Sequence, residues 1–116
     1  MSKFYIWLKL NILKVIIFYM EITSKQRKTL EKLANSLSPI VIVGANGLTP
    51  TLQEKVVQCL AQHELIKIKF NDFKDEKVEL SNKIAQEADA NLIRIIGNTA
   101  IFYRQNDNPE KRQIKF

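Results

Sequence analysis

The chain has 116 residues and a formal net charge of +6. This length suits one domain with a hydrophobic core rather than two, and the 46% hydrophobic and 26% charged residues are typical of a folded protein, not a disordered one. The positive charge favours an anionic partner such as a nucleic acid or a membrane surface. The single cysteine cannot form a disulfide within the chain, and one cysteine with one histidine makes no zinc-type ligand set. We therefore expect a cytoplasmic protein without a metal or other cofactor.

Residues 1–19 differ in composition from the rest of the chain. Apart from three lysines they are almost wholly apolar, and they contain no acid, glycine or proline. The lysines interrupt the long apolar run that a transmembrane helix needs, and no small-residue cleavage site of a secretory signal follows Tyr19. Two interpretations remain. We favour an extension upstream of a true start at Met20, outside the fold; the alternative is an amphipathic helix that anchors the protein to a membrane.

A first helix is expected to begin at Thr23, because its side chain, with Gln26 three residues later, forms a capping box. The helix should end at Pro39. Apolar residues recur at helical spacing and predict a buried stripe of Leu30, Leu33, Ala34 and Leu37. Basic residues fall on the opposite side or its flank: Lys25, Arg27, Lys28 and Lys32. This basic face could follow the phosphates of a nucleic acid, although a solvated surface is the commoner role of such a face.

A strand, a tight turn and a second helix follow at once. Residues 40–43 are apolar and β-branched, as expected of a strand buried on both faces. Residues 44–47 form a Gly-x-x-Gly turn, and Thr49 with Pro50 can cap and open a helix. Glycine lets a phosphate approach the main chain closely, and a helix N-terminus supplies N–H donors and partial positive charge. No acid occurs in residues 32–53 to repel an anion, although a plain connecting turn would also use glycine.

The remaining elements follow from short local patterns. Apolar residues alternate with lysines over residues 65–70, which predicts a half-buried strand. A third helix is expected from Asp75, with Val78 and Ile84 among its buried residues. Strands over residues 92–96 and 99–103 are joined by a two-residue Gly-Asn hairpin turn.

These elements predict an α/β fold in the order α-β-α-β-α-β-β. Right-handed crossovers place the two helices between strands on one face of the sheet, which gives a two-layer sandwich with a mixed four-stranded sheet. Residues 105–116 are polar and basic, and we expect them to form a frayed tail. The open face of the sheet is expected to carry a second group of cations, either for binding or simply facing solvent: Lys67, Lys69, Arg94 and Arg104.

No catalytic residue is predicted. Cys59 and His63 lie four residues apart on the second helix, but Cys59 falls on its apolar face, so we interpret it as a core residue. Glu64 has no second carboxylate near it in sequence, which favours a structural role at the junction between helix and strand. An enzyme that acts on a phosphorylated small molecule held at residues 44–47 is the alternative, although the lysine and serine or threonine of a P-loop are missing.

Four separated segments resemble the YhbY family, the stand-alone bacterial CRM-domain proteins. They occur in the same order along the chain and are TSKQR at residues 23–27, PIVIVGANGLT at 39–49, HELIKIK at 63–69 and IGNT at 96–99, the last followed by Tyr103 and Arg104. The resemblance covers residues 20–104 and leaves residues 1–19 without a counterpart.

This resemblance implies an RNA-binding, non-enzymatic module with the fold of the C-terminal domain of bacterial translation initiation factor three and a KH-like use of its GxxG loop. Family members associate with precursors of the large ribosomal subunit, and plant relatives assist group II intron splicing. The implied partner is therefore ribosomal RNA in large-subunit precursors during ribosome biogenesis. We expect a monomer with no membrane partner. The implied RNA-contacting residues are Gly44, Ala45, Asn46 and Gly47 in the loop and Lys25, Arg27, Lys28 and Lys32 on the first helix.

Overall fold

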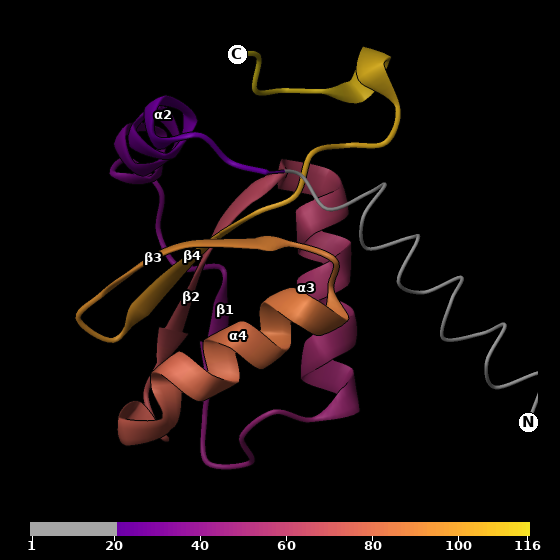
Figure 1. Cartoon of the computed structure of the whole chain (residues 1–116). Coiled ribbons are helices and arrows are strands. Elements are labelled where there is room, and N and C mark those ends of the chain that lie inside the picture. The colour runs from indigo at the N-terminus through magenta and orange to yellow at the C-terminus, as the bar shows by residue number, and fades with distance from the viewer. Residues whose placement is uncertain (1–20) are drawn as a thin grey trace, which may run out of the picture.

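The computed structural model describes residues 21–116, which form three α-helices, two short 3₁₀ helices and a four-stranded sheet (Figure 1). In chain order the elements are α2 (Ser24–Ala34), β1 (Val41–Val43), α3 (Pro50–His63), β2 (Leu65–Phe70), η1 (Lys74–Glu76), α4 (Lys77–Glu87), β3 (Asn91–Ile96), β4 (Thr99–Tyr103) and η2 (Pro109–Lys111). The predicted order of helices and strands is confirmed. The predictions for residues 1–19 lie outside the described part of the chain.

The sheet is mixed, with strand order β1-β2-β4-β3. β1 pairs in parallel with β2, whereas β2 with β4 and β3 with β4 are antiparallel. The hairpin between β3 and β4 has the predicted two-residue turn, in which Gly97 takes a φ of +59°. The registers place four residues in one row across all four strands: Ile42, Lys69, Thr99 and Ile96.

The core lies mainly between the sheet and two helices on one of its faces. Val56 and Leu60 of α3 and Ile84 of α4 pack with inward-facing residues of all four strands, which confirms that these two helices share a face. α2 lies on the other face, where Leu30 and Ala34 form a second cluster with four strand residues: Leu65, Ile93, Ile101 and Tyr103. Leu65 and Tyr103 pair at the start of β2, whereas Ile42 and Ile96 on the same face are exposed, so α2 covers only one end of that face.

Several residues predicted to be buried are exposed. α2 ends at Ala34 with Asn35 as its C-cap, not at Pro39, so Leu37 lies beyond the helix and is 38% exposed. Leu33 lies within α2 but is 44% exposed. Ile42 is 52% exposed because β1 is an edge strand whose outer face α2 does not cover. Val78 lies in the first turn of α4, before the buried positions of that helix begin.

The C-terminal segment is held in place, so the prediction of a frayed tail is wrong. The buried Glu64 carboxylate accepts hydrogen bonds from the main-chain N–H groups of Asn106, Gln113 and Ile114. The ring of Phe116 packs edge-on against the ring of Tyr103, with centroids 6.0 Å apart. A polar composition predicted fraying, but a single buried carboxylate far away in sequence gives this segment fixed partners.

Across residues 21–116, no helix combines the length and the apolar character needed to cross a bilayer.

Candidate nucleic-acid interface

The Gly-x-x-Gly segment forms a closed turn at the end of β1. The N–H of Gly47 donates to the carbonyl oxygen of Gly44 at 3.0 Å, and Gly47 takes a φ of +65°, a conformation that glycine adopts without steric cost. Thr49 then caps α3, because its hydroxyl accepts from the N–H of Leu52 at 3.1 Å, and Pro50 opens the helix as predicted. In Figure 1 this turn lies at the bottom of the molecule, between β1 and α3.

The middle of the turn faces outward. Ala45 and Asn46 are exposed, and a Cβ placed on Gly44 would meet no atom within 4 Å. Within residues 21–116, the main-chain N–H groups of Ala45 and Asn46 donate to no acceptor. These two amides are therefore available to an anion. The helix offers fewer donors than expected, because Thr49 occupies the N–H of Leu52 and proline has none.

The segment between β2 and η1 lies beside the turn. The carbonyl oxygen of Val43 accepts from the N–H groups of Asn71 and Asp72, and the ring of Phe73 lies against Gly47. The fold thus brings Asp72, an exposed acidic residue, close to the turn. The expectation that no acid lies near the turn is therefore wrong, because it considered only neighbours in sequence.

The basic helix is built as predicted, except for one residue. The capping box of Thr23 and Gln26 is present, and Lys25, Lys28 and Lys32 are exposed and form no ion pair with any residue from 21 to 116. Arg27 is half-buried instead, and its guanidinium donates to the carbonyl oxygen of Ile93 in β3. Arg27 therefore fastens α2 to the sheet.

The helix and the turn lie at opposite ends of the sheet. α2 packs near Leu65 and Tyr103, which pair at the start of β2, whereas the turn follows Val43, which pairs with Phe70 at the end of β2. A strand of this length spans about 17 Å. The two predicted parts of the site therefore do not form one cluster, as Figure 1 also shows.

The sheet face between them carries some of the predicted cations. Lys69 is exposed in the row beside Ile42, and the ammonium of Lys67 donates to the carbonyl oxygen of Leu37 at 2.9 Å. Arg94 lies on this face as expected and forms an ion pair with Glu31 of α2 at 3.5 Å. Arg104 does not lie there.

The guanidinium of Arg104 turns toward the other side of the sheet. It donates to the carbonyl oxygen of Ala88, next to α4, and contacts the carboxylate of Asp107 at 3.7 Å. Lys69 is thus the exposed cation that links the α2 end of this face to the turn.

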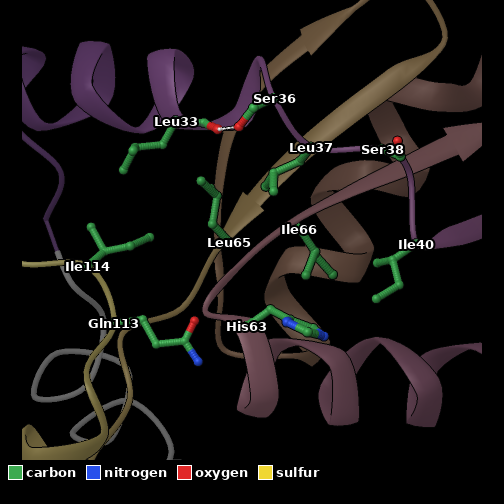
Figure 2. Close-up of a pocket in the computed structure, with 10 residues that line it drawn as sticks. All are labelled: Leu33, Ser36, Leu37, Ser38, Ile40, His63, Leu65, Ile66, Gln113 and Ile114. Carbon is green, nitrogen blue, oxygen red and sulfur yellow. Dashed lines mark hydrogen bonds between the residues drawn. The ribbon is translucent and has the colours of Figure 1, made fainter.

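An apolar groove of about 440 Å³ lies at the α2 end of the molecule (Figure 2). It opens between the segment that follows α2, the end of α3 and the C-terminal segment. His63 is its one titratable residue, and the other lining residues are Leu33, Ser36, Leu37, Ser38, Ile40, Leu65, Ile66, Gln113 and Ile114. Two lining residues carry hydroxyl groups, Ser36 and Ser38, and the Ser36 hydroxyl donates to the carbonyl oxygen of Leu33 at 3.2 Å.

The residues considered for catalysis have structural surroundings. Cys59 is buried in the main core, and the Glu64 carboxylate is occupied by main-chain amides, which confirms both predictions. No group of three or more histidine, cysteine, aspartate or glutamate residues that could hold a metal ion occurs in residues 21–116.

The fold and the turn together define a class of α/β domain. In this class a loop with two glycines follows a strand at one end of the sheet and exposes its main chain. The model of the CRS1/YhbY (CRM) domain family matches residues 22–104, and the chain belongs to this family, as its motifs indicated. The protein resembles "Probable RNA-binding protein PA4753" of Pseudomonas aeruginosa, with 32% identity over 79% of this chain and 89% of that protein. It also resembles an "RNA-binding protein" of Haemophilus influenzae, with 34% identity over 74% of this chain and 88% of that protein.

The fold is also similar to the solution structure of SAV1595 from Staphylococcus aureus. The TM-score is 0.67 at 27% sequence identity, and the similarity covers 82% of this chain and all of that one. The family match ends at residue 104, so the segment held by Glu64 lies beyond it.

Proposed function

We propose that the protein binds RNA and holds a backbone phosphate at the turn formed by residues 44–47. The observation that carries this proposal is that Ala45 and Asn46 are exposed and that their main-chain amides have no acceptor within residues 21–116. Two such donors can bind a phosphate, which the open space at Gly44 leaves room to approach, and KH domains use a GxxG loop on a nucleic-acid backbone in this way. The names of the relatives support RNA as the polyanion.

The lysines of α2 supply a second region of contact. Lys28 and Lys32 are exposed, and Lys69 lies on the sheet face between them and the turn. An RNA strand that follows this face passes from the helix to the turn over a distance of several nucleotides. Arg27 contributes by holding α2 in place, because its guanidinium is already hydrogen-bonded to Ile93.

Contacts of this kind position an RNA without reading its sequence, so we expect low sequence selectivity. We propose no catalytic activity, since Cys59 lies in the core and the Glu64 carboxylate is held by amides. By the family resemblance, the RNA is ribosomal RNA in precursors of the large subunit, and the protein acts in the cytoplasm as a monomer.

The test is RNA affinity as a function of salt concentration. If Lys28, Lys32 and Lys69 each neutralise one phosphate of a single strand, the logarithm of the binding constant should fall with the logarithm of salt concentration with a slope of about −2. An affinity that does not change with salt would contradict this mode of binding.

The ribosomal partner is tested separately by gradient sedimentation of a cell lysate at low and high salt. Co-migration with large-subunit precursors at low salt only is the expected result, and migration at the top of the gradient in both conditions would contradict it.

A further inference from the structure

Phe73 is an exposed aromatic residue in direct contact with the Gly-x-x-Gly turn. Its ring carbons lie 3.2 to 3.7 Å from the position that a Cβ on Gly47 would occupy, yet 42% of the residue is accessible. Among residues 21–116 the other exposed aromatic side chain is Phe116, which packs on Tyr103 away from the turn. An isolated exposed phenylalanine is ordinary. This one lies beside main-chain amides that could bind a phosphate, so its ring could contact the same ligand.

The main chain fixes the position of this ring. Phe73 takes a φ of +55°, a left-handed conformation that is uncommon for a bulky residue. The N–H groups of Asn71 and Asp72 donate to the carbonyl oxygen of Val43, and the N–H of Glu76 donates to that of Phe73 at 3.1 Å. The ring is therefore carried by the short segment between β2 and η1, whose main chain is hydrogen-bonded to the end of β1 next to the turn.

We propose that Phe73 stacks on an unpaired base of the RNA strand whose phosphate is held by the amides of Ala45 and Asn46. The inference rests on the proposed function and narrows its ligand to single-stranded RNA. Aromatic side chains bind unpaired bases through their faces, which every base offers, whereas the bases of a duplex already stack on one another. Lys74, which is exposed and follows Phe73, adds a positive charge for the next phosphate, while Asp72 on the other side disfavours one. The strand therefore leaves the turn on the side of Lys74.

The test compares Phe73→Leu with Phe73→Trp in the full-length protein. Leucine keeps an apolar cover over Gly47 but has no aromatic face, and tryptophan retains one. Val78→Ala, which truncates a residue that is 56% exposed at the start of α4, is the matched control. The probes are a labelled single-stranded RNA of about twelve nucleotides, within the usual site sizes, the same RNA with abasic sites at its central positions, and a duplex. Binding is followed by fluorescence anisotropy, and thermal melting checks that each variant is folded.

Stacking on one base is worth about 1–3 kcal/mol, which corresponds to a loss of about five- to 150-fold in affinity. We expect Phe73→Leu to lose affinity in this range for the single strand and to show little further loss on the abasic RNA, because the two changes remove the same contact. Phe73→Trp and Val78→Ala should bind like the unmodified protein. An equal loss by Phe73→Leu on intact and abasic RNA would overturn the proposal, since the ring would then act only through Gly47.

Gly44→Asp, assayed beside these variants, separates this inference from the proposed function. If Gly44→Asp loses RNA binding and Phe73→Leu does not, stacking is overturned and the phosphate site stands. If Gly44→Asp binds RNA with full affinity, the phosphate site itself is overturned, and with it the stacking that rests on it.

Discussion

The carboxylate of Glu64 accepts a hydrogen bond from the main-chain N–H of Gln113 at 2.5 Å, across 49 residues of sequence. The same carboxylate accepts from the N–H groups of Asn106 and Ile114, and Glu64 is only 1% exposed. A buried carboxylate is tolerated where donors replace its water. This one ties the C-terminal segment to the junction between α3 and β2.

Glu64→Gln should therefore release the C-terminal segment. The amide keeps the side-chain shape and the φ of +61° but replaces one acceptor by a donor that faces N–H groups. We expect a loss of about 2–4 kcal/mol in the free energy of unfolding, since hydrogen bonds to charged groups are among the stronger ones. Urea denaturation measures this, and hydrogen exchange should accelerate at residues 105–116. Gln113→Ala, which removes only the bond from Gln113 Nε2 to the carbonyl oxygen of Gln62, is the control and should cost less than about 1 kcal/mol. Unchanged exchange in Glu64→Gln would contradict this role.

Tyr103 should make the stability depend on pH under alkaline conditions. Burial raises the pKa of Tyr103 to about 12 from 10.0; the negative charge of Glu64 also raises it, and Arg112 and Gln105 partly oppose the shift. Because the unfolded chain loses this proton first, the phenol stabilises the fold fully below pH 10, and this contribution is lost as the pH rises toward 12. We expect a decline on the order of 2 kcal/mol that Tyr103→Phe does not show. Urea denaturation of both proteins from pH 8 upward measures the difference, and identical pH profiles would contradict it.

The two glycines of the turn should respond differently to alanine. Gly47→Ala places a Cβ at a φ of +65° and 3.2 Å from the Phe73 ring, so we expect a loss of about 1–3 kcal/mol in stability. Gly44→Ala meets no atom within 4 Å, and we expect it to be neutral or to stabilise by up to about 1 kcal/mol through the unfolded chain. Thermal melting compares the two. Equal stability of both variants would show that the contact with Phe73 imposes no constraint.

Substitutions of the lysines of α2 should affect RNA binding, whereas substitution of its arginine should affect the stability of the fold. Replacing Lys28 and Lys32 by alanine should make the slope of log binding constant against log salt concentration shallower by about 1.4. The melting temperature should stay almost unchanged, because both side chains are exposed. Arg27→Ala should instead destabilise the fold by about 1–3 kcal/mol, since it leaves the carbonyl oxygen of Ile93 without its donor. Paired melting and binding curves check both statements. If Arg27→Ala were fully stable but bound RNA more weakly, Arg27 would contact the RNA, and its assigned role in stability would be contradicted.

Local chemistry was enough to predict much of this fold. The capping box at Thr23, the cap and proline at Thr49 and Pro50, and the two-residue turn at Gly97 each depend on neighbours in sequence, and each is present. The errors concern contacts between distant segments. Leu33 is exposed because α2 reaches only one end of the sheet, and the C-terminal segment is fixed by a carboxylate that its own composition does not reveal.

The same division applies to the candidate site. The turn at residues 44–47 was visible in the sequence, but the proximity of Asp72 and Phe73 to it depends on hydrogen bonds to Val43 across the parallel strands. Arg27 had the same sequence signature as its neighbouring lysines, and only the packing of α2 against β3 distinguishes it. A positive φ at Phe73 has no signal in a single sequence, because the residue type argues against it.

The phosphate site is tested most directly by the RNA affinity of Gly44→Asp, measured beside Gly44→Asn. Both side chains enter open space at the turn, so both variants should melt like the unmodified protein, and they differ mainly in a negative charge next to the amides of Ala45 and Asn46. We expect Gly44→Asp to lose at least about tenfold in affinity, or about 1.4 kcal/mol, and Gly44→Asn to lose clearly less. A folded Gly44→Asp that binds RNA as tightly as the unmodified protein would show that the phosphate lies elsewhere.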